Sequence, residues 1–277
     1  MKKIFTLAMA VIALAACTNE TEGWDNLSNP ITIDATMASE SRAATKDAFA
    51  AGDAISVYAW TGDATALPAT YVVENSTNTF DGTKWTASPQ MLWKDGTTPH
   101  HFIGIYPARA ISDTEYALAD DGDLLVAITE GVAPSSSPVS LAFDHLMAKL
   151  RVNLTFRNQW TETPAVTSVT AFAKTAATIN YLAKAVTATG EDAANVMTAV
   201  TANTQYEALM VPQECKKVSI VIGDKTYTYN GSITLASGKV ATLNLNVGRS
   251  EITLEGITVN PWTDGVTVDG GEAQEEN

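Results

Sequence analysis

The chain has 277 residues and a net charge of −14 at pH 7, with 17 basic and 31 acidic residues. Such a charge disfavours nucleic acid and anionic lipid as partners, because both attract basic surfaces. Only 17% of the residues are charged and threonine is abundant, a composition that is typical of extracellular β-sheet proteins.

Residues 1–16 have the organisation of a secretory signal peptide. Two lysines precede an apolar run over 4–13, which is too short to span a membrane. Ala15 and Ala16 suit a signal peptidase, and Cys17 follows at the cleavage point. The sequence Leu-Ala-Ala-Cys resembles the bacterial lipobox, which implies that Cys17 is acylated and anchors the chain in a membrane. The alternative is an ordinary signal peptide with an incidental cysteine.

Two-residue alternation of apolar side chains dominates the rest of the chain and predicts half-buried β-strands. The first example, residues 30–38, places Ile31, Ile33, Ala35 and Met37 on one face. We therefore expect this strand to pack with that face inward. Similar patterns lie at 53–60, 149–156, 216–231 and 239–247.

The segment 53–60 carries large apolar residues on both of its faces. Ile55 and Val57 share one face, and Tyr58 and Trp60 lie on the other. Helical periodicity is weak, and we expect short helical pieces only near 144–148 and 191–196.

Many short strands without a βαβ rhythm predict an all-β protein built from β-sandwiches. The strands are too many for one seven-stranded sandwich, and the Pro/Ser-rich loop at 130–140 suggests a boundary near residue 145. The expected organisation is a signal peptide (1–16), a lipidated leader (17–52), an N-terminal sandwich (53–145, completed by strand 30–38) and a C-terminal sandwich (146–277).

Residues with catalytic or metal-binding potential are few, and their arrangement predicts neither a catalytic nor a metal site. His100 and His101 are adjacent, so on a strand they point to opposite faces. The acidic segment 119–123 lacks the ligand spacing of a calcium loop and reads as a turn. If Cys17 is acylated, Cys215 has no partner for a disulfide and reads as a structural cysteine. No cofactor motif is present.

The six tryptophans leave one binding alternative open. Exposed on one face, they would form a platform on which sugars stack, whereas their places beside strand edges and turns favour packing within a sandwich. A carboxylate pair for glycoside hydrolysis cannot be recognised from sequence, since its members meet only in space.

The order of motifs along the chain carries a further signal. After the lipobox come ITIDATM, ESRAATKDAFAAGDAISVYAW, HFIGIYP, DLLVA with VSLAFDHLMAKLRVNL, and finally ITVNPWTDG. Together they resemble the fimbrillin-like family (type V pilins) of Gram-negative anaerobes, over most of the chain. The resemblance implies two tandem transthyretin-like Greek-key β-sandwiches, no enzymatic activity and no cofactor.

The resemblance also implies a processing step. Members of the family are cut after an arginine, which releases the lipid tether and the first strand. Arg42, followed by Ala43, lies in a polar stretch just after the predicted strand, where proteases act. A plain linker arginine is the alternative. The strand with Ile31 and Met37 would then be removable. A donor strand that replaces it in a neighbour would come from the C-terminal segment with Trp262, Val266 and Val268.

The function that follows is that of a fimbrial subunit or tip protein serving adhesion. Its expected partners are other fimbrial subunits, the outer membrane through the lipid on Cys17, and a host or bacterial surface ligand. The expected location is the outer surface of the outer membrane, and the fimbria after processing. A surface glycan-binding lipoprotein is the main alternative, and a hydrolase is a third.

Overall fold

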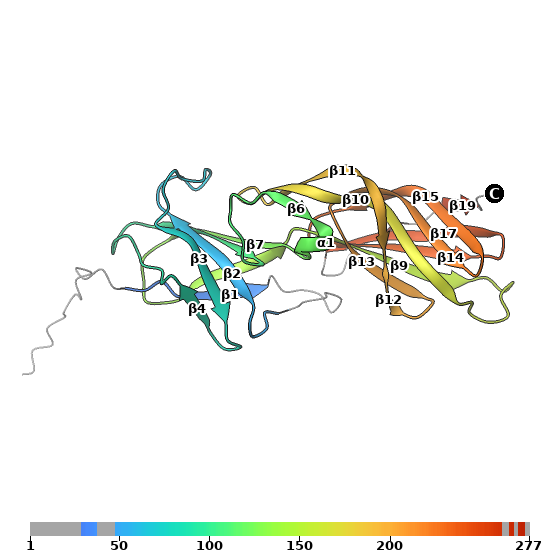
Figure 1. Cartoon of the computed structure of the whole chain (residues 1–277), viewed down its shortest axis with the longest axis horizontal. Coiled ribbons are helices and arrows are strands. Elements are labelled where there is room, and N and C mark those ends of the chain that lie inside the picture. Colours follow the sequence, from blue (N-terminus) through green and yellow to red (C-terminus); the bar gives the residue numbers. More distant parts are fainter. Residues whose placement is uncertain (1–28, 38–47, 262–265, 269–270, 275–277) are drawn as a thin grey trace, which may run out of the picture.

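A computed structural model describes residues 29–37, 48–261, 266–268 and 271–274. Nearly all regular structure within these ranges is β, and the helix found there is the single turn α1 (Leu118–Asp121). The molecule is elongated, with the first sheet at one end (Figure 1). The expected all-β class is confirmed, whereas the helical pieces near 144–148 and 191–196 were wrong. Residues 144–148 span the end of one strand, a two-residue link and the first residue of the next strand, and 191–196 lies in a strand.

The first sheet has seven strands and contains most of the N-terminal half of the chain. β1 (Ile33–Met37) and β8 (Val139–His145) run parallel, and the other pairings are antiparallel. The strand order is β1 (Ile33–Met37), β8 (Val139–His145), β7 (Leu125–Val132), β5 (His100–Tyr106), β2 (Ala54–Trp60), β3 (Val73–Phe80) and β4 (Trp85–Ser88).

Two further sheets contain the remaining strands. One has the order β11 (Ala185–Val196), β10 (Val166–Asn180), β14 (Gln213–Ile222) and β15 (Lys225–Leu235), with β6 (Glu115–Ala117) paired to β10. The other has the order β12 (Thr198–Thr201), β13 (Gln205–Met210), β9 (Ala148–Phe156), β16 (Lys239–Val247), β17 (Glu251–Pro261) and β18 (Val266–Val268), with β19 (Gly271–Gln274) also on β17.

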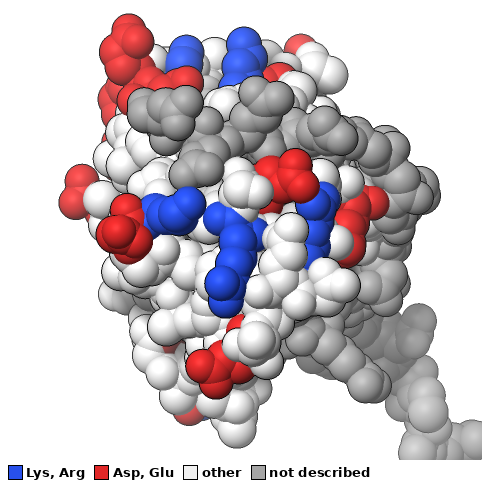
Figure 2. Space-filling view, turned by 90° about the vertical axis from the view of Figure 1, so that its right-hand side faces the viewer, with Lys and Arg blue, Asp and Glu red and all other residues white. Residues whose placement is uncertain are grey.

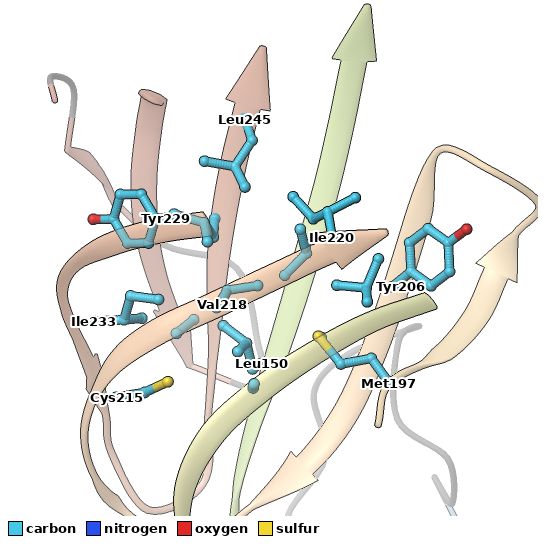
Figure 3. Close-up of a cluster of buried hydrophobic side chains, with 14 of the residues drawn as sticks. Leu150, Met197, Tyr206, Cys215, Val218, Ile220, Tyr229, Ile233 and Leu245 are labelled. Atoms are coloured by element: carbon cyan, nitrogen blue, oxygen red, sulfur yellow. The ribbon is translucent and has the colours of Figure 1, made fainter. Parts of the chain in front are cut away.

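These two sheets enclose a common apolar core. The inward face of β9, with Leu150, meets the inward face of β14, with Val218 and Ile220 (Figure 3). Leu245 of β16 belongs to the same core, and the buried Cys215 lies in it as an ordinary apolar side chain. Burial of such side chains is the main source of stability here, since the described residues contain no disulfide.

A separate core joins the first sheet to the rest of the molecule. Tyr58 and Trp60, on one face of β2, pack with Ile179 and Tyr181 from β10 and its following turn. The opposite face of β2, with Ile55, belongs to a second apolar core, which lies on the other face of the first sheet. Both faces of this strand are therefore buried, which explains its large apolar residues on either side.

The connection between the sheets lies close to the predicted boundary at residue 145. Leu146 and Met147 link β8 to β9, and both are buried in the joining core. β6 departs from a simple division at this point, because it precedes residue 145 yet pairs with β10. The division into 53–145 and 146–277 remains a prediction.

Candidate functional site

The first strand is an integral part of the first sheet. Side chains alternate between buried and exposed along β1, and Ile31, Ile33, Ala35 and Met37 are only 3–8% exposed. The alternation in the sequence therefore corresponds to an inward apolar face and an outward polar face, as a half-buried strand requires.

β1 is held along one side by β8. The parallel register pairs Ile33 with Val139 and runs to the pair of Met37 with Phe143. The Val139 N–H also donates to the Thr32 carbonyl (2.8 Å). These main-chain contacts fix which β1 side chains face inward, because a slip of one residue would turn the whole apolar set outward.

The beginning of the strand is held on its other side as well. The Ile31 N–H donates to the Met91 carbonyl (2.9 Å), and Pro30 forms an isolated antiparallel bridge with Leu92. The residues that lead into β1 thus lie between β8 and the segment that follows β4, whereas β1 itself is the last strand of the sheet. Without these residues, both of these main-chain edges would lose hydrogen-bond partners, a condition that favours the addition of another strand.

The interior side of β1 contacts an apolar surface contributed by several strands. Phe143 and Leu141 come from β8, Phe102 comes from β5, and Met91 and Trp93 come from the segment after β4. All five are buried, and they form one cluster with the β1 side chains. A molecule without β1 would expose part of this cluster as an elongated apolar groove, which we call the β1 groove.

Sequence reasoning identified the β1 side chains but missed the residues that enclose them. Met91 and Trp93 lie two residues apart in the segment PQMLW, and this spacing was an available signal of a buried face. Phe49 also packs against this core, and a single phenylalanine among alanines, outside any alternating pattern, gave little indication of that.

Several residues singled out in the sequence lie outside the described residues. Cys17, Arg42, Ala43 and Trp262 are among them.

The two valines of the expected donor segment lie in β18, of which the backbone is described. Val266 pairs with Val259, and Val268 pairs with Ile257, both on β17. In this form of the protein the segment is thus an edge strand of its own sheet.

The histidines serve packing and local hydrogen bonding. His100 lies against Trp93 and His101 lies against Trp60, on opposite faces of β5, as the adjacent positions predicted. The third histidine, His145, contacts Asp123 (2.7 Å). Over the described ranges, no group of three or more His, Cys, Asp or Glu side chains could hold a metal ion.

Cys215 and the described tryptophans are also packing residues. Burial raises the pKa of the Cys215 thiol, so it is no reactive thiolate. Trp60 and Trp93 are buried in the two cores of the first sheet. Trp85 packs against Phe49, and Trp160 packs against Phe156. Trp60 and Trp93 are too deeply buried to stack on sugars, and Trp85 and Trp160 pack against different cores, so these four tryptophans form no common platform for sugars.

The charged side chains of the surface are interspersed. The end of the molecule seen in Figure 2 carries basic groups among acidic ones rather than in one patch. Ion pairs occur elsewhere as well and join Arg151 to Glu207 (2.6 Å) and Lys184 to Asp144 (2.6 Å). Within the described part of the chain, no helix has the length and apolarity to cross a membrane.

Comparison with known proteins places this architecture in a family. The model of a family described as fimbrillin-like matches residues 41–262. The chain belongs to the fimbrillin-like family, which confirms the resemblance seen in the sequence. A comparison with curated proteins gave no match.

Solved structures support the same fold. The chain is similar to a candidate cell adhesion protein from Bacteroides uniformis, with a TM-score of 0.65 and 17% identity over 84% of this chain and 98% of the other. A second such protein, from Bacteroides ovatus, has a TM-score of 0.64 and 18% identity, and the match covers 87% of this chain and 98% of the other. A fimbrial protein from Bacteroides vulgatus has a TM-score of 0.52 and 12% identity, and the match covers 84% of this chain and 99% of the other. At these identities the likeness establishes the fold.

Proposed function

We propose that the protein is a structural subunit of a surface fimbria that is exported as a lipoprotein and assembled by strand exchange. The observation that carries this proposal is the position of β1, which is buried on its apolar face yet lies at an edge of the first sheet. Membership of the fimbrillin-like family supports a role in fimbriae or adhesion at the cell surface.

In this proposal Cys17 holds the precursor at the outer membrane, and cleavage after Arg42 then frees the body of the protein. The cut falls in the stretch 38–47, between β1 and Phe49. Once it is made, only non-covalent contacts retain β1. An extended strand of a neighbouring subunit, with apolar residues at alternate positions, can then take its place.

Replacement of β1 by a similar strand is energetically favourable for two reasons. The edge of β8 and the Met91 carbonyl regain main-chain hydrogen bonds, and the apolar groove is covered again. Burial of a large apolar side chain contributes about 1.5–3 kcal/mol. Three such side chains, at the positions of Ile31, Ile33 and Met37, therefore contribute several kcal/mol.

The C-terminal segment is our candidate for the donor. β18 pairs with β17 over three residues and β19 pairs with it over four, so both ladders are short, and Pro261, which precedes them, cannot donate a ladder hydrogen bond. Both features favour release of the segment. A donor this short also suits a subunit that accepts a strand without donating one, as a tip protein would.

Protease treatment of the purified precursor tests the processing step. An arginine-specific protease should give a product that begins at Ala43, identified by N-terminal sequencing, and ladders of polymers on a gel. The variant Arg42→Gln should give neither. A product with another N-terminus, or polymers from Arg42→Gln, would refute the assignment.

Metabolic labelling with palmitate tests the anchor separately. The Cys17→Ala precursor should lose both the label and retention in the membrane fraction, because the thiol is the site of acylation. Cys215→Ala is the matched control and should keep both. Labelling that persists in Cys17→Ala would show that Cys17 is not the site of acylation and would refute the lipoprotein assignment.

A further inference from the structure

Phe49 occupies a distinct place at one end of the first sheet. Its ring meets three other aromatic rings edge-on, with centroid distances of 4.9 Å to Trp85, 5.5 Å to Tyr106 and 5.4 Å to Phe143. These partners come from β4, β5 and β8. Phe49 therefore closes the space where these strands meet.

The strand registers show which end of the sheet this is. Tyr106 ends β5, and its ladder partner Leu125 begins β7. Trp85 begins β4 opposite Phe80, the last residue of β3. Met37, the last residue of β1, pairs with Phe143 near the end of β8. All these positions lie at one end of the sheet, so Phe49 closes the end of the β1 groove that Met37 reaches.

The backbone that carries Phe49 is held by a tight turn. The Ala50 N–H donates to Asp53 Oδ2 (2.6 Å), and the Asp53 N–H donates to the Ala50 carbonyl (3.0 Å). The Tyr106 hydroxyl donates to the other carboxylate oxygen of Asp53 (3.3 Å). One of the three rings around Phe49 thus also fixes the turn that presents it.

The ring of Phe143, the ladder partner of Met37 and a ring neighbour of Phe49, is closely confined. A Cβ atom placed on Gly104 would lie 2.6 Å from Phe143 Cζ, so this ring occupies the space beside the glycine. The end of the groove is therefore built from packed rings and is not expected to yield to a longer strand.

We propose that Phe49 is the stop of the β1 groove and sets the register of the strand that replaces β1. This inference rests on the strand exchange proposed above. Phe49 lies after Arg42, so it stays with the mature subunit when β1 leaves. An incoming strand from a second subunit then places its last inward side chain at the position of Met37, against Phe143, and cannot place another beyond it.

Peptide binding to the cleaved full-length protein tests this stop. The short probe is residues 29–37 of this chain, NPITIDATM, with a fluorescent label. The long probe, NPITIDATMTV, adds a valine with the same inward parity as Met37. Each is titrated in excess, in urea too dilute to unfold the protein, into wild-type, Phe49→Leu and Phe49→Ala proteins after arginine-specific cleavage.

In the wild-type protein the long probe should bind no more tightly than the short one. In Phe49→Ala it should bind about tenfold more tightly than the short one, equivalent to about 1.4 kcal/mol, because the added valine finds room at the end of the groove. Phe49→Leu should give a smaller gain. It also carries the test if circular dichroism shows that Phe49→Ala does not fold.

The outcomes separate this proposal from the one on which it rests. If the long probe binds more tightly than the short one by the same factor in wild-type and variant proteins, Phe49 sets no register, although strand replacement stands. If neither probe binds any of the cleaved, folded proteins, strand replacement itself is overturned, and the register with it.

Discussion

The ring of Phe143 lies where any side chain on Gly104 would have to be. An ideal Cβ on this glycine would be 2.6 Å from Phe143 Cζ and 3.3 Å from Leu141 Cδ1. The glycine is thus needed for a close approach of β8 side chains to β5. Because Phe143 is also the ladder partner of Met37, this contact supports the groove in which β1 lies.

Gly104→Ala should therefore lower the free energy of unfolding by about 1–3 kcal/mol, the usual cost of overpacking a core. The measurement is urea denaturation of the uncleaved precursor. The double variant Gly104→Ala/Phe143→Leu should recover part of the loss, since the smaller side chain leaves room for the methyl group. Losses that simply add would show that the two residues do not conflict.

The burial of β1 predicts a strong contrast between its two faces. Ile33→Asp places a carboxylate in the apolar cluster and should lower the free energy of unfolding by more than about 3 kcal/mol. Thr36→Asp, on the exposed face of the same strand, is the matched control and should change it by less than about 1 kcal/mol. If both variants melt like the wild type, β1 is not packed in the precursor and the removable strand is excluded.

The inward face of β1 could be predicted because alternation along one strand is a local property of the sequence. The partners of a strand are not local, and this limits sequence reasoning. The large apolar residues Tyr58 and Trp60 indicated a second buried face on β2. The residues that cover this face, Ile179 and Tyr181, lie more than a hundred residues further along the chain. Periodicity says that a face is buried but not what buries it.

The segment 191–196 illustrates a different failure. Its sequence EDAANV contains good helix formers, and local propensity favoured a helix. In the structure it is the end of β11, paired with β10 from Ala185 to Val196 except at a bulge. Here the long ladder with β10 outweighed the weak local preference, as tertiary context commonly does.

A buried histidine makes stability depend on pH. His100 Nδ1 lies 2.8 Å from the Thr98 carbonyl oxygen, and the Lys94 N–H donates to Nε2 (3.2 Å). This pairing assigns the single proton of a neutral ring to Nδ1, so a second proton would break the bond from Lys94. Burial lowers the pKa of His100, although the Thr98 carbonyl opposes that shift in part.

Because the pKa is lower in the folded state, the unfolded chain takes up the proton first as the pH falls. The free energy of unfolding should therefore decrease as the pH drops from about 6.5, the ordinary value, towards the pKa of the folded state. Denaturation at pH 7.5 and 5.5 measures this slope. His100→Gln should make it shallower. An unchanged slope in this variant would show that other groups cause the pH dependence.

The C-terminal segment offers the most direct test of polymerisation. Deletion of residues 263–277 removes β18 and β19, which together pair with seven residues of β17. The inward faces of β9 and β16 stay covered by β14 and β15, so the core enclosed by these sheets should remain folded.

If the segment is the donor, the cleaved variant should form no polymers on a gel but should still accept a labelled NPITIDATM peptide. Polymers that form at the wild-type rate would show that another segment donates the strand. A cleaved wild-type protein that binds the peptide yet forms no polymers itself would identify a subunit that only accepts a strand, as expected for a tip.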